Sequence, residues 1–178
     1  MAIVQCVPNF SEGRDLEKIE KIVTPLRGKE GVKLLNYEAD ENYNRVVVTV
    51  IGDPQKVKNA VLEAIGVAKD VIDMNVHKGQ HSRFGATDVC PFIPIKDMTM
   101  EDAINIAKEL GEEVAKKYEI PVFLYEQAAS KSERENLATV RKGEYEGLDT
   151  KFKDENWVPD FGQAKKHPSA GAIAIGAR

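Results

Sequence analysis

Only three histidines occur in the sequence, and two of them, His77 and His81, lie four residues apart in one short polar segment. A histidine titrates near neutral pH, so it can accept a proton from an attacking amine and return it to a leaving group. Lys78 and Arg83 lie in the same segment and carry positive charge that can hold carboxylates. The segment therefore predicts acid–base chemistry on a substrate with carboxylate groups.

The sequence leaves two other interpretations of the histidine pair open. In the first, His77 and His81 only cap a helix end and complete hydrogen bonds where it meets the next strand. In the second they bind zinc, because a spacing of four suits two ligands on one helical face. Against zinc, Gly79 lies between them, no Glu follows the first histidine as in a metalloprotease motif, and no Cys is close in sequence. We therefore expect no metal.

Other polar positions also admit two interpretations. Asn44 and Arg45 begin a predicted strand, where the arginine is either a solvated hairpin charge or a guanidinium presented to a substrate carboxylate. Asn9 and Ser11 follow the first predicted strand, where they either line a site or stabilise a turn. No glycine-rich phosphate motif and no serine nucleophile elbow is present, so nucleotide chemistry has no support.

Size and charge narrow the class of protein. A chain of 178 residues suits one domain, residues 1–178, and 42% apolar with 30% charged residues is typical of a globular protein. The net charge of -4 comes from interspersed charges without a basic stripe, so we expect no nucleic acid partner. Cys6 and Cys90 lie in apolar runs, where burial without a disulfide is expected. With no signal peptide and no membrane span, a cytoplasmic location is expected.

Hydrophobic periodicity gives the elements that must position these residues. Turn chemistry is predicted at Asn9–Gly13, a capping box at Ser132–Glu135 that opens a short helix, and a long ordered loop at Gly143–Ser169. Helices are predicted at residues 16–26, 54–72 and 99–118, and strands at 3–7, 32–37, 45–51, 87–95, 122–125 and 171–176.

The order strand, helix, strand, strand, helix, strand is the split βαβ, or ferredoxin-like, pattern. The predicted fold class is therefore α+β, a two-layer α/β sandwich in which helices lie on one face of a mixed β-sheet of about six strands.

Taken in chain order, six motifs resemble those of the glutamate formiminotransferase family. They are Val7–Gly13 (VPNFSEG), Asn44-Arg45, His77–Ala86 (HKGQHSRFGA), Asp88–Phe92 (DVCPF), Gly143–Glu146 (GEYE) and Pro159–Gly162 (PDFG). The resemblance runs from Ile3 to Arg178 and is to the amino-terminal subdomain of the formiminotransferase domain.

The resemblance implies transfer of a formimino group from N-formimino-L-glutamate to tetrahydrofolate, a co-substrate, in histidine degradation and one-carbon metabolism. It places the family's catalytic histidine at His81, as general base on the folate nitrogen and then as acid to the departing glutamate amine. The family's folate contacts match Gly162, Gln163, Ala164, Lys165, Lys166, His167, Pro168, Ser169, Ala170 and Gly171. Further candidates for lining the site are Glu38, Asn44, Arg45, His77, Lys78, Arg83, Asn9 and Ser11.

Four positions depart from the family pattern and bear on substrate choice and affinity. Glu38 stands where the family usually has Asp, Gln80 replaces Glu, Ser82 replaces Pro and Ala170 replaces an aromatic residue.

The family also continues into a second subdomain, which forms the other wall of the folate tunnel and is expected to be absent from this chain. We therefore expect a homodimer, or pairing with that subdomain through an apolar face. The alternatives to formimino transfer are a non-catalytic folate- or partner-binding module and a transferase that uses N-formylglutamate.

Overall fold

The first half of the chain forms the predicted split βαβ unit. The computed structural model describes all 178 residues. β1 and β2 are two parts of one strand that lies between β4 and β5 and pairs antiparallel with both, while β3 pairs with the far side of β4. The elements are β1 (Ile3–Cys6), β2 (Asn9–Phe10), α1 (Leu16–Val23), β3 (Val32–Asp40), β4 (Arg45–Gly52), α2 (Pro54–Val71) and β5 (Thr87–Lys96).

The second half extends this sheet by two strands. β7 lies between β5 and β6 and runs parallel to both, which makes the seven-stranded sheet mixed, as predicted. The additional elements are α3 (Met100–Tyr118), β6 (Val122–Glu126), α4 (Leu137–Arg141), α5 (Leu148–Lys151) and β7 (Ile173–Ala177), with 3-10 turns at Thr24–Leu26, Ser132–Arg134 and Glu155–Trp157. None of these helices combines the length and apolarity needed to cross a membrane.

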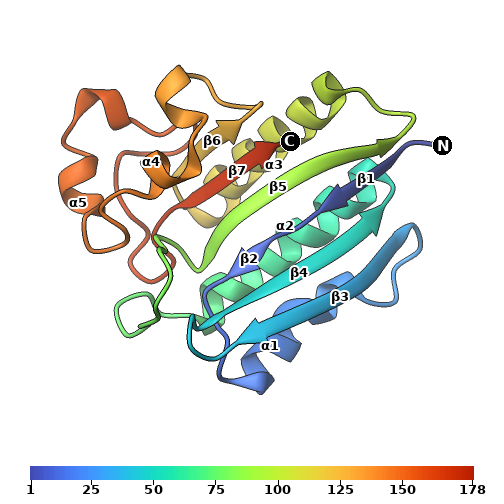
Figure 1. Ribbon diagram of the computed structural model, residues 1–178, viewed down its shortest axis with the longest axis horizontal. Helices are drawn as coiled ribbons and strands as arrows, with labels where there is room; N and C mark the ends of the chain where they lie inside the picture. Colours follow the sequence, from blue (N-terminus) through green and yellow to red (C-terminus); the bar gives the residue numbers. More distant parts are fainter.

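The long helices cover one face of the sheet, with α2 and α3 behind it in Figure 1. Successive strand residues point to opposite faces, so Val122 packs near Gly111 of α3 while Phe123 faces the other way. There Phe123 stacks on Phe152 at 5.9 Å and meets Trp157 at 6.0 Å between ring centroids. The segment around α5 therefore covers the second face of the sheet at β6.

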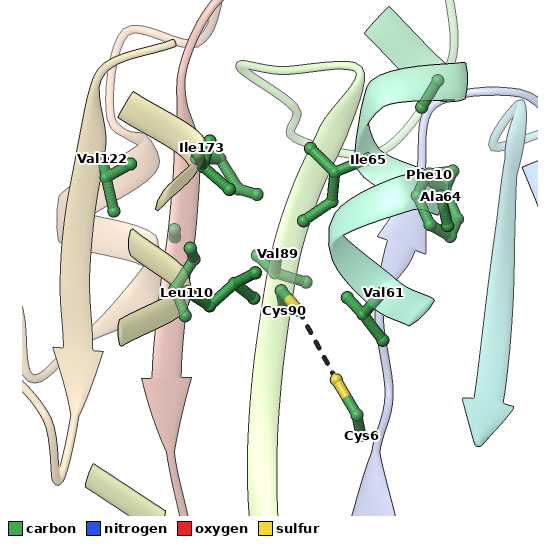
Figure 2. Packing of buried hydrophobic residues seen from close by; sticks show 14 of the residues in the cluster. Cys6, Phe10, Val61, Ala64, Ile65, Val89, Cys90, Leu110, Val122 and Ile173 are labelled. Atoms are coloured by element: carbon green, nitrogen blue, oxygen red, sulfur yellow. Dashed lines mark hydrogen bonds between the residues drawn. The ribbon is translucent and has the colours of Figure 1, made fainter. Parts of the chain in front are cut away.

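One continuous cluster of buried hydrophobic residues fills the space between the sheet and the long helices and also includes Phe123 and Leu148 on the second face. Figure 2 shows side chains of α2 and α3 packed against β1, β5 and β7. Cys6 and Cys90 are buried and free, with their Sγ atoms 3.5 Å apart across β1 and β5, so their expected burial is confirmed.

Two local predictions were wrong. The predicted turn at Asn9–Gly13 begins later, because Asn9 and Phe10 form β2 and pair with both neighbouring strands. The predicted capping box at Ser132 does not form, since Ser132–Arg134 is a 3-10 turn without a side-chain cap. The short helix begins at Leu137 instead, where the Asn136 side chain accepts hydrogen bonds from two backbone amides.

Arg134 anchors the irregular segment that follows β6, and its side chain is only 1% exposed. It donates to the carboxylate of Asp160 at 3.1 Å and to the carbonyl O of Val158 at 2.7 Å, and its guanidinium lies over the rings of Phe123 and Trp157. We expect Arg134→Met to lower the free energy of unfolding by about 2 to 3 kcal/mol, because buried acceptors lose their donor.

Urea denaturation measures this change. Lys153→Met is the matched control, because it removes a charge from an exposed side chain of the same segment. Ordinary surface substitutions change the free energy of unfolding by less than about 0.5 kcal/mol. If both variants lose no more than that, the anchoring role of Arg134 is contradicted.

Candidate functional site

Asn44 joins three segments that are distant in sequence. It ends the hairpin between β3 and β4 with φ 53°, a left-handed conformation that asparagine tolerates better than most residues. Its side chain is buried, and Oδ1 accepts from the amide of Gly13 at 2.8 Å while Nδ2 donates to the carbonyl O of Lys78 at 2.8 Å. With both side-chain groups engaged, Asn44 positions the histidine segment.

Asn44 also binds His77 through its backbone carbonyl. Its Nδ1 accepts from Nε of Arg83 at 3.3 Å, which assigns the ring proton to Nε2, and Nε2 donates to the carbonyl O of Asn44 at 2.8 Å. Burial, together with the nearby Arg83 charge, lowers the pKa of His77 below its usual value. Of the interpretations given for the pair, these contacts fit the structural one for His77.

The charge of Arg83 is satisfied within the protein. Its side chain is 4% exposed, and Nη2 lies 2.7 Å from the carboxylate of Glu146, with Glu144 at 3.4 Å from Nη1. The hydrogen bonds from Arg83 lower the pKa of Glu146 to about 2. Lys78, by contrast, is exposed and forms no ion pair, so it is the freer of the two predicted carboxylate holders.

His81 differs from His77 in having no partner. The ring is half-buried, and both ring nitrogens are shielded from solvent without a hydrogen bond in the protein. Burial, reinforced by the charges of Arg45 and Arg141, lowers the pKa of His81 to about 4. At neutral pH the ring is therefore uncharged, and one of its nitrogens has a lone pair that can accept a proton.

The segment around His81 packs closely against the β3–β4 hairpin. A Cβ on Gly79 would lie 2.2 Å from the carbonyl O of Tyr43, so glycine is required there. Otherwise the segment Lys78–Ser82 is largely exposed and is tied down by few bonds, including Gln80 N to Asn42 O at 3.3 Å. Because the ring nitrogens are shielded, a ligand reaches them only when the ring or this segment shifts.

Two neighbours of His81 were not among the predicted site residues. The ring of Tyr43 meets His81 edge-on at 6.2 Å between centroids, and the guanidinium of Arg45 lies 5.2 Å from the centre of the Tyr43 ring. Arg141 reaches the same segment from α4. Tyr43 stood next to the predicted pair Asn44 and Arg45 and was within reach of sequence reasoning. Nothing in the sequence connected Arg141 with His81.

A row of residues crosses the uncovered face of the sheet. Glu38 pairs with Val47, Val47 with Asn9, and Asn9 with Val89, so all four point to one face. Arg45, two residues before Val47, shares it. Glu38 is exposed, and Asn9 donates to the carbonyl O of Val7 at 3.1 Å. The predicted candidates Glu38, Asn9 and Arg45 therefore share a face.

Ser11 lies elsewhere and is fully buried. Its Oγ donates to the carbonyl O of Gly85 at 2.8 Å and its amide donates to the carbonyl O of Ala86 at 2.8 Å. Of the two interpretations given for Ser11, these contacts fit the structural one.

The predicted folate stretch Gly162–Gly171 divides into two parts. Residues 162, 163 and 165–168 line a hollow of about 460 Å³ together with the end of α3, and no residue of the His77–Arg83 segment borders it. Residues 169–171 instead lie against the residues on either side of the His77–Arg83 segment. The carbonyl O of Ser169 accepts from the amide of Met74, and the carbonyl O of Ala170 accepts from the amide of Ala86. His167 closes the turn, with Nδ1 accepting from the amides of Ser169 and Ala170.

Because the chain has only three histidines, their titration can be followed individually by NMR. We expect His81 to titrate near pH 4 and His77 below its usual value, with the proton of neutral His77 on Nε2. Removing a nearby positive charge with Arg45→Gln should raise the pKa of His81. A His81 midpoint near 6.5 in the unaltered protein would contradict the described environment.

The same lowered pKa makes stability depend on pH. A histidine whose pKa is lower in the folded than in the unfolded protein binds fewer protons when folded. Its contribution to stability is therefore complete above about pH 6.5, the usual value for histidine, and is lost as the pH falls toward 4.

Comparisons with known proteins identify relatives over the whole chain. Residues 3–178 match the family described as formiminotransferase domain, N-terminal subdomain. The chain is 47% identical over 176 residues to a glutamate formimidoyltransferase of Streptococcus pyogenes, and 43% identical over 180 residues to one of Thermoplasma acidophilum. It is 47% identical over 176 residues to a formimidoyltransferase-cyclodeaminase of Dictyostelium discoideum. These matches cover 99%, 100% and 99% of the chain, but only 59%, 59% and 33% of the respective relatives.

Proposed function

The chain belongs to the formiminotransferase family, as the N-terminal subdomain of the formiminotransferase domain, and on this premise we propose that it takes part in formimino transfer. The proposed donor is N-formimino-L-glutamate, the acceptor is tetrahydrofolate and His81 carries the proton. Nearly the whole length of this chain matches relatives named glutamate formimidoyltransferase, and these names support the reaction class.

The unpartnered ring of His81 is the observation that carries this proposal. His77 and His167 each use Nδ1 as an acceptor for a protein donor, whereas neither nitrogen of His81 has a partner. A general base needs an unprotonated nitrogen that is not already engaged. The pKa of about 4 for His81, set by burial and then by neighbouring arginines, keeps the ring unprotonated at neutral pH.

The proposed reaction uses His81 twice. A nitrogen of tetrahydrofolate attacks the formimino carbon, and His81 accepts the proton that this nitrogen loses. The tetrahedral intermediate then collapses as the imidazolium returns the proton to the departing amine of glutamate. Burial, and then the charges of Arg45 and Arg141, disfavour the imidazolium, so the protonated ring is a stronger acid than an ordinary imidazolium and returns its proton readily.

The uncovered face of the sheet supports a further part of the proposal. Glu38, Asn9 and Arg45 share this face, and Arg45 has no carboxylate within ion-pair distance. We propose that this face forms one wall of a folate site, whose other wall is the remainder of the formiminotransferase domain. The length of the relatives is consistent with such a remainder, since the chain spans about 59% of two of them.

An absorbance assay for 5-formimino-tetrahydrofolate tests the proposal. The chain is mixed with tetrahydrofolate and N-formimino-L-glutamate, alone and with the remaining part of the Streptococcus pyogenes relative supplied as a separate chain. We expect product in the second mixture at least. A parallel reaction with N-formyl-L-glutamate measures donor choice, and a faster formyl reaction would favour that alternative.

Calorimetry with folate separates the binding-module alternative from the enzyme. Binding of folate without product from either donor, in either mixture, would contradict formimino transfer and favour a non-catalytic module.

A further inference from the structure

Two hydrogen bonds fix Arg141 beside the segment Lys78–Ser82, which contains His81. It is the last residue of α4, and its Nη1 donates to the carbonyl O of Ser82 at 3.1 Å and to Oδ2 of Asp88 at 2.6 Å. Ser82 directly follows His81, so this contact holds the guanidinium next to the proposed proton carrier. Asp88 is itself buried and accepts from the amide of Phe84 at 2.8 Å, which makes it a rigid support for the arginine.

One edge of this guanidinium is unused. Both of its hydrogen bonds come from Nη1, and Nε is buried without any partner in the protein. Nε and Nη2 carry two parallel N–H donors, the geometry that binds a planar carboxylate at both oxygens. A buried donor without an acceptor is unfavourable, and a bound carboxylate would satisfy it.

We propose that the Nε and Nη2 edge of Arg141 binds a substrate carboxylate beside His81. The identity of the ligand rests on the proposed function, because both the glutamate of the donor and the glutamate tail of tetrahydrofolate carry carboxylates. Arg83 cannot serve in the same way, since Glu144 and Glu146 already occupy it.

The local electrostatics agree with an anionic ligand at this place. After burial, the charges of Arg45 and Arg141 contribute to the lowered pKa of His81, so the ring lies in a positive environment. Nε of Arg141 and both ring nitrogens of His81 are each shielded from solvent. Binding therefore requires a local shift, which the exposed and sparsely bonded segment Lys78–Ser82 can provide.

Calorimetry on the full chain with matched pairs of ligands tests the assignment. L-glutamate is compared with its α-carboxamide and its γ-carboxamide, and folate is compared with pteroate, which lacks the glutamate tail. In the unaltered protein we expect one acid to bind about ten to a hundred times more tightly than its matched analogue. The pair that shows this preference identifies the source of the carboxylate.

Arg141→Lys should abolish the preference, because lysine keeps the charge beside Asp88 but lacks the planar fork. Lys142→Gln, which removes a charge from the exposed neighbour, should retain it. If Arg141→Lys fails to fold, the double substitution Asp88→Asn with Arg141→Met removes both charges together and should also lose the preference.

The assignment is wrong if Arg141→Lys keeps the preference, or if the unaltered protein shows none or binds none of the ligands. The test measures binding and does not depend on turnover. The proposed transfer reaction can therefore fail while the Arg141 preference stands. Conversely, normal turnover with an unchanged preference in Arg141→Lys overturns the Arg141 assignment alone.

Discussion

Replacement of His81 by alanine lowers kcat for formimino transfer at least about a hundredfold, because a positioned general base contributes roughly that much or more. The fold should survive, since neither ring nitrogen of His81 forms a hydrogen bond within the protein. Folate affinity should also change little, because the role assigned to His81 is proton transfer. The measurement is the rate of 5-formimino-tetrahydrofolate formation at saturating substrates, accompanied by folate calorimetry.

Gln80→Ala is the matched control for this substitution. Gln80 precedes His81 in the same exposed segment, and only its backbone amide forms a bond. Its kcat should therefore stay within a few-fold of the unaltered protein, which shows that disturbing the segment is not itself the cause of the loss. Similar rates in His81→Ala and Gln80→Ala would rule out His81 as the proton carrier.

Asn44→Ala should have the largest effect on stability, lowering the free energy of unfolding by about 3 to 5 kcal/mol. Alanine would have to adopt the left-handed conformation at φ 53°, and the amide of Gly13 and the carbonyl of Lys78 would lose their partners. The His77 segment would lose its main tie to the hairpin, so kcat should fall as well. Urea denaturation and the product assay measure the two effects.

Asn44→Gly separates the two causes. Glycine accepts the left-handed conformation without strain but also lacks the side chain. Compared with Asn44→Ala, its free energy of unfolding should be about 1 kcal/mol higher, while kcat should stay as low. Equal stability of Asn44→Ala and the unaltered protein would contradict the role of Asn44 as an anchor.

Elements with strong local signals were predictable from sequence. The start of α2 is one of them: the Asp53 side chain caps the helix and Pro54 opens it, and both effects depend on neighbouring residues only. The position of β7 between β5 and β6 was not predictable. Its small apolar residues contain no information about which strand they join, and the pairing depends on parallel contacts distant in sequence.

The different roles of the two histidines lay beyond sequence reasoning for a similar reason. His77 and His81 have the same chemistry and share one segment, and only the carbonyl of Asn44 and the guanidinium of Arg83 distinguish them. The false capping box at Ser132 shows the reverse case. Its residues match the motif, yet a 3-10 turn places Arg134 in the core instead, where it meets Asp160 and two aromatic rings.

The structure divides the predicted site residues into two groups. Glu38, Asn9 and Arg45 share the uncovered face, whereas the side chains of Ser11, Asn44, His77 and Arg83 are buried and engaged in internal bonds. Burial of polar side chains cannot be deduced from residue type, so positioning residues and ligand-binding residues look alike in sequence.

The pH dependence of kcat/KM, compared with the NMR titration of His81 in the same protein, tests the central claim most directly. A general base must be unprotonated, so kcat/KM should fall as the pH drops through the pKa of His81, near 4. The kinetic midpoint and the NMR midpoint should coincide, and Arg45→Gln should raise both together. A kinetic midpoint that stays unchanged while the His81 midpoint moves would contradict His81 as the proton carrier.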